Sequence, residues 1–136
     1  MAVEMTGKYL GGLNVEVKHG PSGTVLRTAA PVDNHGDGSS FSPTDLVAAA
    51  LGACMVTIMG IIANRDGIDL QGLTFHLEKH MNSDPRRIGR IPIRIEMPAG
   101  LSEPQRRKLE RGALTCPVHR SLLDEVEKPV EFVYPD

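Results

Sequence analysis

The chain has 136 residues, of which 40% are hydrophobic, 24% are charged and 4% are aromatic. This length predicts a single domain over residues 1–136, and the net charge of −2 argues against a nucleic-acid or acidic-membrane surface. Two cysteines in no CxxC pair do not predict a disulfide framework, and no basic, signal-like segment opens the sequence. We therefore expect a cytoplasmic protein with no membrane and no nucleic-acid partner.

The N-terminal part is expected to form short strands. Residues 13–18 (LNVEVK) alternate apolar and polar side chains, and residues 24–28 (TVLRT) resume this pattern after a turn cluster at residues 19–23. A polar loop over residues 33–40 leads to the next element.

The stretch SPTDLVAAALGACMVTIMGIIANRDG, residues 42–67, predicts one long helix. Ser42 is the expected N-cap, and Pro43 follows in the first turn. Asp45 occupies the third helical position, where its carboxylate could complete a capping box. Gly67 is the candidate C-cap.

No charged residue occurs from Leu46 to Ala63, a run of 18 residues that reaches the lower limit of a membrane span. Alanine and glycine dilute the hydrophobicity of this run, and the rest of the chain alternates like a soluble sheet. We therefore predict a helix of a soluble domain. Because it has no clean polar face, we expect it to be buried on most sides.

Two longer strands are expected over residues 73–79 and 90–97, with a hairpin turn over residues 82–87 between them. Pro92 cannot donate to a sheet ladder, so its strand is predicted at an edge or a bulge.

The C-terminal part predicts two helices and a strand. Residues 102–105 (SEPQ) form a capping-box signature that opens a helix through Ala113. Residues 116–123 (CPVHRSLL) predict a second, short helix, and residues 130–134 a final strand. This order predicts an α+β fold with helices on one face of a mostly antiparallel sheet.

Cys54 lies in the middle of the long helix, with Ala50 and Ile58 four residues away on either side. A free cysteine in such a stripe is commonly a packing residue. Cys116 stands at a predicted helix start, where amides and the helix dipole can lower a thiol pKa, and His119 and Arg120 add donors or positive charge. If the two thiols meet in space, a sulfenic acid formed by a peroxide on one could condense with the other to a disulfide.

Zinc is the other chemistry considered, because Cys116 and His119 have CxxH spacing. A full site needs about four ligands, and the remaining candidates occur in no recognised order. We expect no metal and no bound cofactor.

The pattern SPTDLVAAALGAC, followed some sixty residues later by TCPVHRSL, resembles the OsmC/Ohr superfamily of osmotically inducible and organic-hydroperoxide-resistance proteins. The resemblance covers the whole chain in element order. It implies an OsmC-like fold, with antiparallel sheets and a long central helix, in an intertwined homodimer. It also implies a thiol peroxidase with sites at the dimer interface, in which Cys54 is peroxidatic and Cys116 resolving. An organic hydroperoxide would be the substrate and an external dithiol, such as a lipoyl group, the reductant.

One family feature differs in this sequence. Peroxidase members typically carry a Glu ten residues before the first cysteine, paired with an Arg that orients the thiolate; here that position is Thr44. The adjacent Asp45 is our candidate for the catalytic acid, with helix capping as the alternative. Arg27 and His35 are positional candidates for the cation, with an ordinary surface role as the alternative. A small-molecule binder or redox sensor without peroxidase turnover remains the second functional hypothesis.

Overall fold

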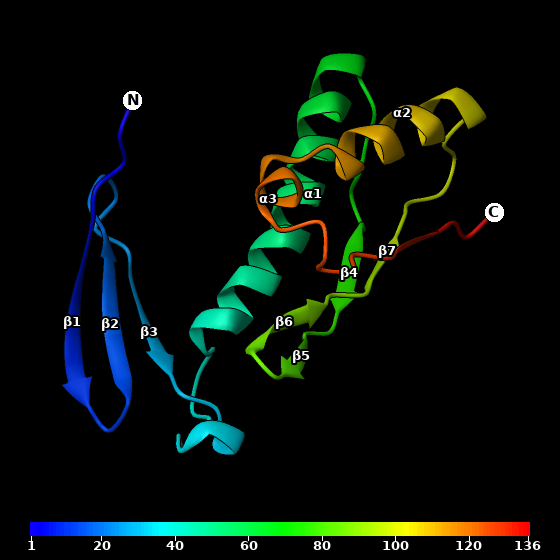
Figure 1. Ribbon diagram of the computed structural model, residues 1–136. Coiled ribbons are helices and arrows are strands. Elements are labelled where there is room, and N and C mark those ends of the chain that lie inside the picture. The colour runs from blue at the N-terminus through cyan, green and yellow to red at the C-terminus, as the bar shows by residue number, and fades with distance from the viewer. The chain divides into compact units, whose positions relative to one another are not determined.

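The computed structural model describes residues 1–136. It combines helices with small sheets in an α+β fold (Figure 1). The chain divides into two compact units, residues 1–47 and residues 48–136. The elements in chain order are β1 (Met5–Gly11), β2 (Asn14–His19), β3 (Val25–Ala29), the 3-10 helix η1 (Val32–Asn34), α1 (Pro43–Asp66), β4 (Thr74–Leu77), β5 (His80–Ser83), β6 (Arg86–Arg90), β7 (Ile93–Glu96), α2 (Glu103–Leu114), α3 (Pro117–Ser121) and β8 (Val130–Val133).

The first unit contains an antiparallel sheet in the order β1-β2-β3, with Val17 opposite Leu26. The strands predicted over residues 13–18 and 24–28 correspond to β2 and β3 and are confirmed. Strand β1 was not predicted. Gly7 takes an apolar position of its alternation and weakens the sequence pattern.

Helix α1 begins and ends where its sequence signals indicate. The Asp45 amide donates to Ser42 Oγ at 3.0 Å, and the Ser42 amide donates to Asp45 Oδ2 at 2.8 Å. These reciprocal bonds satisfy two backbone donors at the helix start and form the predicted capping box. Gly67 adopts φ 69° beyond the last turn, the left-handed conformation that glycine reaches without strain.

Within this chain α1 is buried on one face. Leu51, Met55 and Met59 are fully buried and share a stripe at helical spacing. On the opposite face Ala53 is exposed and Ile61 is 56% exposed. By length and composition α1 could cross a membrane, and 39% of its most apolar stretch is buried. The prediction of burial on most sides is therefore not met by the single chain.

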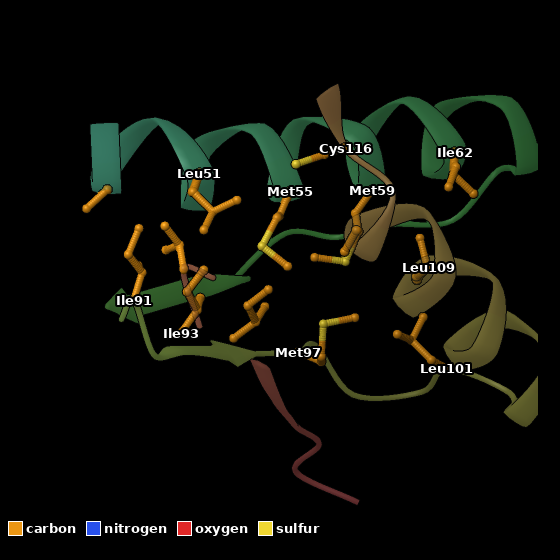
Figure 2. Close-up of a cluster of buried hydrophobic side chains, with 14 residues drawn as sticks. Leu51, Met55, Met59, Ile62, Ile91, Ile93, Met97, Leu101, Leu109 and Cys116 are labelled. Carbon is orange, nitrogen blue, oxygen red and sulfur yellow. The ribbon is translucent and has the colours of Figure 1, made fainter. Parts of the chain in front are cut away.

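The second unit has its core between α1, the strand β7 and α2 (Figure 2). The buried stripe of α1 faces Ile93 of β7 and Leu109 of α2 in this cluster. Gly52 is needed where α1 meets β4, because a Cβ there would lie 2.5 Å from Phe75 Cε2. This close packing fixes the middle of α1 against the sheet.

The predicted hairpin of residues 73–79 and 90–97 is confirmed, because β4 pairs antiparallel with β7 and the chain reverses between Ser83 and Arg86, inside the predicted turn of residues 82–87. A separate hairpin, β5–β6, lies between these segments, while β4 pairs antiparallel with β7 and β8 pairs parallel with it. Pro92 falls between β6 and β7. Because β7 lies between β4 and β8 in its sheet, it is a central strand, and the predicted edge position is wrong. The proline interrupts the run and divides it between two sheets, and the single mostly antiparallel sheet is replaced by three small ones.

Candidate functional site

The structure brings the two cysteines together although they are remote in the sequence. Cys54 is half-buried in the middle of α1, and Cys116 is fully buried in the core of the second unit. Both are free thiols, and the Cys54 side chain lies near Cys116. Figure 2 shows Cys116 against α1, near Met55 and Met59. The site is therefore a pair of unbonded thiols beside an apolar core.

Cys116 is held by the start of a short helix. It is the N-cap of α3, with Pro117 in the first helical turn as the sequence predicts. The His119 amide donates to Cys116 Sγ at 3.3 Å. The chain reaches this cap directly from α2, which ends at Leu114. The position of α2 therefore sets the position of the Cys116 sulfur.

The expectation that the helix start lowers the pKa of Cys116 is wrong. Burial raises the pKa of the Cys116 thiol, and the neighbouring Cys54 thiol raises it further, while the amide of His119 acts in the opposite direction. Desolvation outweighs the backbone amides of His119 and Val118 because the sulfur has lost its contact with water. Cys116 therefore remains a protonated thiol at neutral pH.

The charges expected beside Cys116 are weaker than the sequence indicates. Burial, followed by the positive charge of Lys128, lowers the pKa of His119, so this imidazole is neutral at pH 7. Arg120 is exposed. Lys128 donates to the carbonyls of Leu123 at 3.2 Å and Val126 at 2.7 Å, which closes the loop after α3. Nothing in the local sequence pattern around Lys128 indicated this role.

Asp45 and Thr44 lie in the first turn of α1, in the first unit. Asp45 caps the helix through the Ser42 amide, and the Thr44 hydroxyl lies 3.2 Å from the Ser42 hydroxyl. The capping alternative for Asp45 thus has a direct structural basis.

Arg27 and His35, the candidate cations, also belong to the first unit. Arg27 donates to Ser39 Oγ at 3.3 Å, and His35 follows η1 with φ 69°. Their observed roles are local to the loop before α1.

No group of three or more His, Cys, Asp or Glu side chains is placed to hold a metal ion.

These features define a dithiol protein of α+β fold, in which one cysteine lies within a long apolar helix and the other caps a short one. The family model described as OsmC-like protein matches residues 36–130. The chain therefore belongs to the OsmC-like protein family.

Solved structures agree with this assignment. The chain is 38% identical to a protein from Psychrobacter arcticus 273-4, provisionally named an osmotic stress induced and detoxification response protein, with a TM-score of 0.89 over 97% of this chain and 95% of that one. The fold is also similar to the organic hydroperoxide resistance protein OsmC from Legionella pneumophila (21% identity, TM-score 0.73, 98% and 97% covered). A third is an organic hydroperoxide resistance protein from Elizabethkingia anophelis (16% identity, TM-score 0.75, 98% and 96% covered). Among curated proteins none matches this chain.

Proposed function

We propose that this protein is a thiol-dependent peroxidase that reduces organic hydroperoxides with Cys54 and Cys116. One observation carries the proposal: two free thiols, 62 positions apart in the chain, lie near each other in the folded protein. Structures of the same fold from Legionella pneumophila and Elizabethkingia anophelis are described as organic hydroperoxide resistance proteins, which supports this chemistry.

The different burial of the two thiols supports different roles. Cys54 is half-buried and can be reached by a substrate, whereas Cys116 has no exposed surface. The Cys54 thiolate therefore attacks the peroxide, and Cys116 acts second. The apolar residues of α1 around Cys54 favour an organic hydroperoxide over hydrogen peroxide, because they provide no polar partners for a small hydrophilic substrate.

The reaction balances in three steps. The Cys54 thiolate attacks the distal oxygen of ROOH and the O–O bond breaks, so that Cys54 becomes a sulfenic acid. The alkoxide RO⁻ leaves and takes up a proton to give ROH. The Cys116 sulfur then attacks the Cys54 sulfur, its proton leaves with the hydroxyl group as water, and a disulfide forms. An external dithiol, such as a dihydrolipoyl group, reduces the disulfide by two electrons and is itself oxidised to a disulfide. A cytoplasmic location, which we also propose, would supply such a dithiol.

We also propose that the active form is a homodimer. The exposed face of α1 carries Ala50, Ala53, Thr57 and Ile61, an apolar stripe that a second copy of this helix could cover. Ile61→Asp should produce a monomer by light scattering after gel filtration. Gln71→Asp places the same charge on an exposed loop and should leave the assembly unchanged.

The deciding experiment counts free thiols after the reduced protein meets cumene hydroperoxide. The proposal predicts rapid loss of two thiols in the wild type and no fast loss in Cys54→Ser. Cys116→Ser retains Cys54 as its one thiol, which should be lost to a sulfenic acid that has no resolving partner. Thiols that survive an excess of peroxide in the wild type would support the second hypothesis, a small-molecule binder or redox sensor without turnover.

A further inference from the structure

Helix α2 determines where Cys116 lies. Its residues Leu109 and Ala113 are fully buried in the core, and the chain passes from Leu114 through Thr115 to the Cys116 cap. A shift of α2 would therefore carry the Cys116 sulfur with it. The contacts that hold α2 on its other side bear directly on the distance between the two sulfurs.

Four side chains join α2 to the C-terminal segment, and we call them the C-terminal clamp: Arg106, Glu110, Tyr134 and Asp136. The Tyr134 hydroxyl donates a hydrogen bond to Glu110 Oε2. The Arg106 guanidinium carbon lies 4.1 Å from the centroid of the Tyr134 ring, and Arg106 Nη2 lies 3.0 Å from Asp136 Oδ1. Asp136 also accepts from the Gly100 amide at 3.0 Å, in the connection that precedes α2.

The clamp is anchored in the same sheet on which α1 packs. Tyr134 follows β8, which pairs with the central strand β7, and Ile93 and Ile95 of β7 belong to the core beneath α1. The clamp therefore fixes α2 relative to the strand that supports the helix carrying Cys54. Core packing holds the side of α2 that carries Leu109 and Ala113, and the clamp holds the side that carries Arg106 and Glu110.

Tyr134 is suited to act as a fixed donor. Burial, with the neighbouring Glu110 carboxylate, raises the pKa of Tyr134 above its ordinary value, so the hydroxyl keeps its proton throughout the physiological range. A hydrogen bond to a carboxylate is stronger than one between neutral groups. The ring is at the same time covered by Arg106.

We propose that Glu110 and Tyr134 are positioning residues for the resolving step: by holding α2, they keep the Cys116 sulfur in reach of a Cys54 sulfenic acid. The inference rests on the proposed peroxidase function. Reaction rates depend steeply on such alignment, and a displacement of about 1 Å can lower a rate by about a hundredfold. The clamp should therefore act on disulfide closure and leave the first oxidation of Cys54 unaffected.

The test separates the two steps in Tyr134→Phe and Glu110→Gln. Tyr134→Phe keeps the ring beneath Arg106 and removes only the hydroxyl, and Arg107→Gln on the exposed side of α2 serves as the control. After rapid mixing with cumene hydroperoxide, we expect sulfenic acid formation within about twofold of wild type and disulfide closure slowed about tenfold. Mass spectrometry should then find more Cys54 sulfinic acid in the clamp variants, because the sulfenic acid persists and meets a second peroxide.

The outcomes distinguish this inference from the proposed function. Clamp variants that close the disulfide at the wild-type rate, or that slow both steps equally, overturn the positioning role while peroxidase activity stands. A wild type that loses no thiols overturns the peroxidase and this inference with it. If Tyr134→Phe fails to fold, Glu110→Gln provides the same measurement, since it keeps the shape of the side chain but removes the carboxylate charge that strengthens the hydrogen bond from Tyr134.

Discussion

The reciprocal capping bonds at the start of α1 allow the two roles considered for Asp45 to be separated. Ser42→Ala removes the acceptor of the Asp45 amide, and Ser42 is 2% exposed, so water cannot easily replace the hydroxyl. Loss of such a cap costs about 1 kcal/mol of unfolding free energy, or about 3 °C in the melting temperature of a chain of this size. Asp45→Asn keeps an oxygen that can accept from the Ser42 amide but removes the charge near the helix N-terminus, which costs about 0.3–1 kcal/mol.

The assay combines thermal unfolding of the reduced protein with the rate of thiol loss to cumene hydroperoxide. If Asp45 acts as a cap, both variants should melt earlier than wild type and lose thiols within about twofold of the wild-type rate. A different result would refute this reasoning: an Asp45→Asn protein that melts like wild type but no longer reacts with peroxide. Its carboxylate would then act in the chemistry, as the sequence position of Asp45 suggested.

Three further predictions follow from local geometry. Gly52→Ala should lower the midpoint of urea unfolding. Overpacking against Phe75 costs about 1–3 kcal/mol, which outweighs a helix-propensity gain of at most about 1 kcal/mol. An unchanged midpoint would contradict the close contact. The raised pKa of Cys116 means that the folded state holds the thiol proton more tightly than the unfolded chain does. The reduced protein should therefore lose stability as pH rises above about 8.5. Thermal unfolding measured across this pH range should show a flatter dependence for Cys116→Ser. The lowered pKa of His119 changes stability in the opposite direction: stability should fall as pH drops below about 6.5. Parallel plots of melting temperature against pH for wild type and His119→Gln would argue against this contribution of His119.

The parts of the fold that the sequence predicts well are those fixed by neighbours in the chain. Ser42 and Ser102 both accept the capping bonds that their signatures predict, because a capping box needs residues only three positions apart. Gly67 likewise ends α1 through its own backbone conformation. The pairing of strands is different, since Pro92 breaks one apparent strand into two that join different sheets. Only the core packing of the whole unit decides which strand becomes central.

The candidate site shows the same division. The pairing of Cys54 with Cys116 was inferred from a family resemblance, and the structure places the two thiols near each other. The pKa of Cys116 was not predictable from its helix position, because its burial depends on residues remote in the chain, such as Leu51 and Leu109. The contact between Glu110 and Tyr134 joins residues 24 apart and has no sequence signal of its own.

The buried and exposed faces of α1 explain how the proposed peroxidatic thiol can occupy such a helix. Leu51 and Met55 are on the face that packs into the core, whereas Ala53 and Thr57 are on the exposed face. At about 100° per residue, Cys54 lies between these faces, which agrees with its half-buried state. One side of the sulfur therefore meets the buried Cys116, and the other side remains open to a substrate or to a second copy of the helix. A cysteine one position later would be sealed in the core, and a cysteine one position earlier would be turned away from Cys116. The proposed chemistry therefore depends on the position of Cys54 at the border between the buried and exposed faces of α1.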